Sequence, residues 1–260
     1  MTSWWAFPPN TRKVEFDEKW SFVGKKEAHC DRAKPADDLC GDHWDHVAFD
    51  PEHRLVLSLV CGRRTEDHSR LLVEDCQERT GGRLLALLCS DENPAYATAI
   101  LAVYGEEVVP ERTGRPGRPA APYRVAPEGL NYATVHKERQ GGRVIAVTTR
   151  TVYGSAGAEG VSTSHLERFN GTDRNRNGRK VRKAYTFSKD WDVHEAMSAF
   201  TIFSYNFCWP VRTLRERGAD RTWQPRTPAM AAGLADHVWS LAEWLTLPGV
   251  DRIKTVHDDS

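Results

Sequence analysis

The stretch that decides the fold is KVEFDEKWSFVG, residues 13–24, in which polar and apolar side chains alternate and aromatic residues are frequent. This pattern predicts a β-strand that carries Asp17. Two further strand-like segments follow at 43–50 and 54–61, and the sequence DPEH between them, residues 50–53, is typical of a turn. The three segments together predict an antiparallel meander.

A helix and a short buried strand are predicted after the meander. Thr65 is placed to cap a helix that runs to Thr80, where two glycines end it. The run RLLALLCS, residues 83–90, has the apolar character of a strand that is buried on both faces. Strand, helix and strand in this order predict a parallel crossover. We therefore expect the later strands to run parallel to the first.

The remaining segments predict one α/β domain with an insertion. Residues 105–142 form the expected inserted loop region, because 106–129 is rich in Pro, Gly and Arg. Val144–Tyr153 is β-branched and predicts a strand. We expect residues 1–12 to be an N-terminal extension, 13–247 the domain and 248–260 a C-terminal tail. Helices are predicted at 94–104, 164–183 (with a break near Gly178), 192–207, 228–234 and 240–247.

Composition favours a soluble protein with segregated charge. The chain has 260 residues, is 40% apolar and carries no formal net charge, so it can bury a core but has no overall attraction to a polyanion. Residues 27–52 hold eight acids and two bases, whereas 167–183 hold seven bases and two acids. The six cysteines include no Cys-x-x-Cys pair, and we find neither a signal sequence nor a membrane-length apolar stretch. We expect a cytoplasmic protein without a membrane partner.

Three acidic residues stand where a metal site needs them. Asp17 lies inside the first predicted strand, Asp91 follows the apolar run, and Glu167 lies at the start of the arginine-rich helix. Carboxylates in these three places converge in the ribonuclease-H-like fold. Mg²⁺ and Mn²⁺ prefer oxygen ligands, and two such ions about 3.5–4 Å apart can promote cleavage of a phosphodiester. The sequence therefore predicts a two-metal site.

Each acid also has a structural interpretation. Asp17 can be a solvated strand residue, and Asp91 can cap the helix that begins at Pro94. Ser164-x-x-Glu167 fits a capping box, in which the glutamate returns to the N-cap amide. A further alternative is a zinc site of mixed histidine and cysteine ligands, although their spacing is unusual for zinc: His29, Cys30, Cys40 and His43.

Longer motifs connect these residues to a known family. The motifs are DEKWSFVGKK (17–26), GRRT (62–65), STSHLERFNGTDRNRNGRKVRKAYTFSKDW (162–191), HEAMSAF (194–200), YNFCWP (205–210), TPAMAAG (227–233) and VWSL (238–241). With them the chain resembles, over residues 13–247, the catalytic domain of the insertion-sequence-one type of DDE transposase. The resemblance implies a ribonuclease-H-like mixed sheet flanked by helices. It also implies two Mg²⁺ or Mn²⁺ ions held by Asp17, Asp91 and Glu167. Family members show Thr-Asp-Gly at the second acid, where this chain has Ser90-Asp91-Glu92, so Glu92 is a further possible ligand.

The resemblance implies cleavage of DNA 3′-ends and strand transfer to target DNA, by a homo-oligomer associated with a bacterial nucleoid. The family typically carries an N-terminal DNA-recognition region, but only 12 residues precede the first predicted strand here. We therefore expect a truncated or split element or a repurposed relative, and in a split element a separate polypeptide would supply DNA recognition. Two other interpretations stay open. One is a non-catalytic DNA-binding remnant that regulates a full-length transposase, and the other is a stand-alone nuclease of similar fold.

The segment after Glu167 predicts contacts with DNA. Asn170 and Arg174 follow Glu167 by three and seven residues and share its helix face. Asn170 is expected to orient a metal-bound water, and Arg174 to contact phosphate. The alternative is a solvated polar face. The other bases of the segment are predicted to contact the DNA backbone: Arg168, Arg176, Arg179, Lys180, Arg182 and Lys183.

Overall fold

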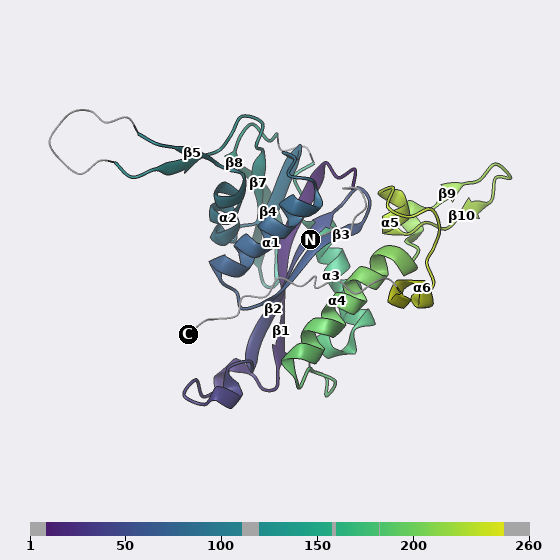
Figure 1. Ribbon diagram of the computed structural model, residues 1–260, viewed down its shortest axis with the longest axis horizontal. Helices are drawn as coiled ribbons and strands as arrows, with labels where there is room; N and C mark the ends of the chain where they lie inside the picture. Colours follow the sequence, from purple (N-terminus) through teal and green to yellow (C-terminus); the bar gives the residue numbers. More distant parts are fainter. Residues whose placement is uncertain (1–8, 111–119, 158–159, 182, 247–260) are drawn as a thin grey trace.

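The centre of the protein is a six-stranded mixed sheet with helices on both faces (Figure 1). A computed structural model describes residues 9–110, 120–157, 160–181 and 183–246. The strand order is β3-β2-β1-β4-β7-β8, so the strand that carries Asp17 lies inside the sheet. This is a mixed α/β architecture, and it is compatible with the ribonuclease-H-like class that the sequence predicts.

The first three strands form the predicted antiparallel meander. β1 (Lys13–Val23) pairs with β2 (Gly41–Asp50), and β2 pairs with β3 (Leu55–Gly62). β3 is buried along its whole length, as expected for a strand covered on both faces. The acidic segment between β1 and β2 contains two short 3-10 helices, η1 (Glu27–His29) and η2 (Pro35–Asp37).

The predicted parallel crossover is also present. Thr65 caps α1 (Glu66–Arg79), and its Oγ1 accepts a hydrogen bond from the His68 amide at 3.4 Å. The chain then enters β4 (Leu87–Asp91), which pairs in parallel with β1. α2 (Pro94–Tyr104) follows directly. Asp91 is thus the last residue of a central strand, at the edge where the strand's carboxyl end meets the next helix.

β7 (Tyr132–Gln140) and β8 (Arg143–Tyr153) complete the sheet and correct two predictions. The sequence places 132–140 in an inserted loop region, but residues 132–135 of this segment pair in parallel with β4 and are buried in the sheet. β8 runs antiparallel to β7, so the expectation that all later strands run parallel to β1 is wrong for β8. Gly141 and Gly142 reverse the chain between them, both with positive φ.

The rest of the predicted insertion includes a hairpin that projects away from the sheet (Figure 1). It consists of β5 (Glu106–Val108) and β6 (Tyr123–Val125), which pair antiparallel. Residues 111–119, which hold most of the Pro- and Gly-rich sequence, lie outside the described residues. An inserted loop therefore stays a prediction for that part.

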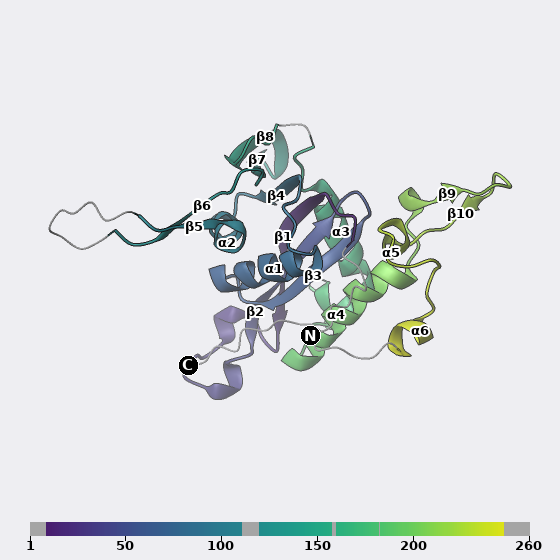
Figure 2. The same ribbon diagram turned by 45° about the horizontal axis from the view of Figure 1, so that its top comes forward.

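Two hydrophobic clusters assign the helices to opposite faces of the sheet (Figure 2). One cluster joins Phe16 of β1 to Leu72 of α1 and Tyr96 of α2. The other joins Val47 of β2 to residues of α3 and α4, including Leu166 and Ile202. α3 spans Ser164–Arg176 and is followed by η3 (Gly178–Lys180), in agreement with the predicted break near Gly178, and α4 spans Trp191–Cys208.

The C-terminal part adds small elements beyond α4. They are η4 (Arg212–Leu214), the two-stranded pair β9 (Glu216–Arg217) and β10 (Trp223–Gln224), α5 (Pro228–Ala231) and α6 (Leu241–Thr246). Two of them, α5 and α6, fall inside the helices that the sequence predicts. Within the described ranges, none of the helices has the length and apolar character needed to cross a membrane.

Candidate active site

One face of β1 is hydrogen-bonded to α3. Glu15 Oε2 accepts from the Leu166 amide at 3.0 Å, and Asp17 Oδ2 accepts from Asn170 Nδ2 at 2.9 Å. Lys19 forms a buried ion pair with Asp173. Alternate residues of a strand share a face, and residues three or four apart share a helix face. Every second residue of β1 (15, 17 and 19) therefore meets a residue on one face of α3 (166, 170 and 173), which holds α3 along β1 with Asp17 in the middle.

The three predicted acids line one pocket of about 430 Å³. Asp17 enters from β1, Asp91 from the end of β4, and Glu167 from the first turn of α3. Their carboxylate oxygens do not all lie within 4.8 Å of one another. Among the described residues, three potential ligand atoms come that close only in a separate group in the core. The pocket also includes Glu92 and Thr163.

Asp17 is the most perturbed acid of the pocket. Burial raises its pKa to about 7, and the charges of Asp91, Glu18 and Glu167 act in the same direction. Asn170, which donates to Asp17, is itself buried, and its Oδ1 has no hydrogen-bond partner among the described residues. The sequence places Asn170 in the DNA-contacting segment and predicts that it orients a metal-bound water; in the structure it is buried against Asp17, as a positioning residue for that carboxylate.

Asp91 does not cap α2, which corrects that alternative. The N-cap is Asn93, whose Oδ1 accepts from the Ala95 amide at 3.2 Å. Asp91 Oδ1 accepts instead from the Asn93 amide at 3.1 Å. Burial raises the pKa of Asp91, and the charge of Glu18 adds to this shift. The carboxylate is thus held at the pocket by the turn that follows β4.

Glu18 supports the pocket from the opposite face of β1. Its carboxylate accepts hydrogen bonds from Arg64 Nε at 2.6 Å, Asn93 Nδ2 at 3.1 Å and the Tyr96 hydroxyl at 3.1 Å. These contacts join β1 to α2 and to the loop before α1. These hydrogen bonds hold the Glu18 carboxylate away from the pocket. Of the two neighbouring acids, Asp17 therefore lines the pocket and Glu18 has a structural role.

Glu167 does not close a capping box. The Ser164 amide donates to Ser162 Oγ at 3.1 Å, and Glu167 Oε1 accepts from Thr163 Oγ1 at 2.7 Å. The same oxygen forms an ion pair with Lys137 of β7. The side chain of Glu167 is 45% exposed. Its carboxylate therefore faces the pocket and a cation rather than its own helix terminus.

A basic rim from β7 borders the acids and was missed from the sequence. Lys137 and Arg139 line the pocket together with His136, which is paired with Glu92. Tyr132, Thr134 and Val135 at the start of this strand are residues that favour β structure, but the polar residues that follow them resemble a loop, and the sequence predicts an inserted loop here. Glu92 is engaged with His136 and stays only a possible further ligand.

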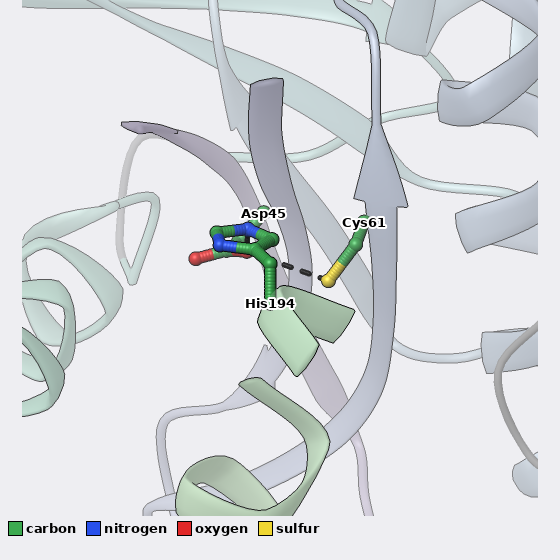
Figure 3. Close-up of side chains that lie close together, drawn as sticks. All are labelled: Asp45, Cys61 and His194. Atoms are coloured by element: carbon green, nitrogen blue, oxygen red, sulfur yellow. Dashed lines mark hydrogen bonds and ion pairs between the residues drawn. The ribbon is translucent and has the colours of Figure 1, made fainter. Parts of the chain in front are cut away.

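A second cluster of potential ligands lies deep in the core. Asp45, Cys61 and His194 face one another within 4.8 Å (Figure 3). Two lysine ammonium groups contact the same Asp45 carboxylate, Lys180 at 2.5 Å and Lys19 at 3.2 Å. Burial alone would raise the pKa of Asp45, but these two cations hold it well below its usual range. A metal ion would compete with two buried ammonium groups, so we interpret the cluster as a structural ionic network.

This network corrects the prediction for Lys180. Its side chain is fully buried between Asp45 and Asp173, and it cannot reach a DNA backbone. Arg176 is half-buried, and its guanidinium is engaged with the Trp209 ring, 4.3 Å from the ring centroid. Among the other predicted DNA-binding bases, Arg168 and Lys183 are exposed, Arg174 and Arg179 are half-buried, and Arg182 lies outside the described residues. The segment therefore does not present one continuous basic face.

The alternative zinc site receives no support from the described residues. No three of His29, Cys30, Cys40 and His43 bring their ligand atoms within 4.8 Å of one another. His43 is instead hydrogen-bonded through Nε2 to the Leu39 carbonyl at 3.1 Å, and its ring packs on Trp191.

Asp17→Asn is expected to stabilise the metal-free protein near neutral pH. The unfolded chain ionises Asp17 near pH 4, whereas the folded protein does so only near pH 7. A raised folded pKa means that wild-type stability falls as pH rises from 4 to 7, and the loss is then complete. Asparagine does not ionise, so the free energy of unfolding of the variant should exceed that of the wild type by about 2–4 kcal/mol at pH 8.

Asparagine preserves the local hydrogen bonds, because a flip of the Asn170 amide presents its unpartnered Oδ1 to the new amide group. Urea unfolding in EDTA between pH 4.5 and 8 measures the effect. A constant stability difference between variant and wild type across this range would contradict the expected titration.

No protein-family model matches the sequence, and no curated protein matches it. Among solved structures, the protein is similar to the Mos1 transposase in a paired-end complex with the left transposon end. The likeness covers 34% of this chain and 32% of that chain, at 18% sequence identity and a TM-score of 0.23. The chain thus spans about a third of the length of that transposase chain. A TM-score this low supports no statement about fold or function, and the family resemblance rests on the sequence motifs.

Proposed function

We propose that the protein is the catalytic domain of a DNA transposase, which cleaves DNA 3′-ends and joins them to target DNA with two divalent metal ions. The observation that carries the proposal is the single pocket lined by Asp17, Asp91 and Glu167. These acids come from a strand, the end of the adjacent strand and a helix, as the resemblance to insertion-sequence-one type transposases implies.

The donor set fits Mg²⁺ or Mn²⁺. All three acids offer hard oxygen ligands, and Asn170 Oδ1 adds a buried acceptor without a partner among the described residues. Lys137 already places a cation at Glu167. In this proposal Asp17, Asp91 and Glu167 would hold two ions, which would supply Lewis-acid activation of the attacking water or 3′-hydroxyl and of the phosphate.

The chain's own residues prepare the site for an anionic strand. Asn170 holds Asp17 through Nδ2 and leaves Oδ1 to accept a hydrogen bond from a water or hydroxyl. Lys137 and Arg139 bring positive charge to the pocket rim. When a phosphate approaches, Lys137 can exchange its ion pair with Glu167 for a phosphate oxygen, which frees the carboxylate for a metal.

The proposal includes the partners that the family resemblance implies. These are DNA element ends, target DNA, further copies of the chain assembled on DNA, and a separate DNA-recognition polypeptide in the bacterial cytoplasm. A stand-alone nuclease with the same pocket would cleave DNA without joining it. Strand-transfer products therefore separate the two activities.

The test combines a binding measurement with an activity measurement. Mn²⁺ at 100 times its dissociation constant is expected to stabilise the wild type by about 2.7 kcal/mol and to do less for Asp91→Asn, which lacks one charged ligand. Metal-free Asp91→Asn is expected to be more stable than metal-free wild type by about 1 kcal/mol, because carboxylate repulsion is relieved.

Wild type should also nick supercoiled plasmid in Mn²⁺ and join a 3′-hydroxyl oligonucleotide to it. Cleavage without joining would indicate a stand-alone nuclease instead of a transposase. If Mn²⁺ does not change the melting temperature and the plasmid stays intact, the protein is a non-catalytic DNA-binding remnant.

A further inference from the structure

A second groove lies on the other side of α3 from the acid pocket. It has a volume of about 580 Å³ and runs between α3 and the segment that follows α4. We call it the arginine groove, after three of its residues: Arg54, Arg168 and Arg212. No acidic residue lines it.

The three arginines are available for an anion. Within the described residues, none of them forms an ion pair or a side-chain hydrogen bond with another residue. Arg168 and Arg212 are exposed, and Arg54 is half-buried. Elsewhere on the surface, by contrast, arginines such as Arg63 and Arg226 are paired with glutamates. A concave site with unpaired guanidinium groups and no acid attracts phosphate, because guanidinium offers a forked set of donors.

The rest of the groove is aromatic. Phe169 packs on Phe49 and Tyr205, with ring centroids 5.2 and 5.0 Å apart, and forms the apolar wall. Trp209 stands at the rim and is 49% exposed. Arg176 lies against its ring at 4.3 Å and holds it in place. A fixed, half-exposed tryptophan beside cationic groups is the combination that binds an unpaired base by stacking and its phosphates by charge.

The two sites share the first turn of α3. Thr163 and Glu167 line the acid pocket, whereas Ser164, His165 and Arg168 line the arginine groove. A helix rises only 1.5 Å per residue, so one nucleic-acid strand can contact both sides of this turn. Continuity with the acid pocket points to a segment of the same strand.

We propose that the arginine groove binds single-stranded DNA next to the cleavage position, with phosphates on Arg54, Arg168 and Arg212 and one unpaired base stacked on Trp209. The proposal rests on the proposed function, because it takes the strand from the acid pocket. It adds a site for an unpaired nucleotide, which a duplex cannot fill without opening a base pair.

The test measures the affinity for a short fluorescent single-stranded oligonucleotide in EDTA, so that no cleavage is involved. Trp209→Leu is expected to weaken binding about 5- to 100-fold, the usual value of one base–aromatic stack, and to leave the salt dependence unchanged. Arg212→Gln is expected to reduce the log–log salt slope by about 0.7 for the lost phosphate contact.

The protein contains a matched control. Trp223 is 50% exposed and is covered by Arg215 at 4.2 Å, but it belongs to β10, whose residues do not line the groove. Trp223→Leu and Arg215→Gln are expected to bind like wild type. An oligonucleotide with abasic positions should bind wild type as weakly as the normal oligonucleotide binds Trp209→Leu.

Equal affinities for wild type and Trp209→Leu, in proteins that melt at the same temperature, would overturn the proposal. Equal binding of the abasic and normal oligonucleotides would also overturn it, because charge alone would then suffice. If Trp209 contributes to binding but the wild type never nicks DNA, the groove stands and the function proposed for the acid pocket falls.

Discussion

Glu167→Gln is expected to lower the rate of Mn²⁺-dependent plasmid nicking about 10²–10³-fold, equivalent to roughly 3–4 kcal/mol of transition-state stabilisation. Glutamine removes the charge that a divalent ion needs but keeps an oxygen that can accept from Thr163 Oγ1. The ion pair of Glu167 with Lys137 in the wild type is partly exposed, so its loss should change the free energy of unfolding by less than about 1 kcal/mol. Rate and stability should therefore separate.

Glu138→Gln is the matched control for this variant. Glu138 is an exposed glutamate of β7, one residue beyond Lys137, and it does not line the acid pocket. It should nick like wild type. If Glu167→Gln also nicks like wild type, Glu167 holds no catalytic metal, and the two-metal proposal is wrong whatever the other acids do.

The acids could be placed from the sequence because each depends on local pattern. An alternating run predicts β1, so Asp17 falls inside a strand, and a short apolar run predicts β4, so Asp91 falls at its end. The parallel pairing of β1 and β4 then brings the two carboxylates to one region of the sheet. Local pattern also gave the start of α3, and thus the place of Glu167, although Thr163 rather than Ser164 is its N-cap.

The basic rim was hidden because β7 changes character along its length. Tyr132, Ala133, Thr134 and Val135 are buried in the sheet, whereas the residues from Glu138 onward are exposed in the hairpin with β8. The second half of such a strand is polar on both faces and looks like a loop. Pairing with a distant strand decides its structure, and a single sequence does not contain that pairing.

Lys180 shows the opposite error, in which a buried group looks like surface charge. The sequence GRKVRK offers four similar bases, and no periodic apolar pattern marks one of them as interior. Lys180 is buried because two carboxylates from elsewhere in the chain, Asp45 and Asp173, meet it in the core. Burial of a charge is set by such partners, which lie up to 135 residues away.

Lys180→Met is expected to destabilise the protein by about 3–5 kcal/mol, because it leaves a buried carboxylate without its nearest cation. Burial lowers the pKa of Lys180, but Asp45 and Asp173 more than offset this and keep it charged at all relevant pH values. The melting temperature should fall by about 6–20 °C. Arg179→Met, at the adjacent half-buried base, should change stability by no more than about 1 kcal/mol.

A double variant makes the same test independent of packing. Lys180→Met with Asp45→Asn removes one charge of each sign and leaves the Lys19–Asp173 pair intact, so it should be more stable than the sum of the single variants by about 1–3 kcal/mol. Asp173 and Asn170 lie on the same face of α3. Disruption of the ion pairs among Lys180, Asp45 and Asp173 should therefore also weaken the hydrogen bond from Asn170 to Asp17 in the acid pocket. Stable folding of Lys180→Met, with no coupling to Asp45, would show that the network does not hold α3 on the sheet.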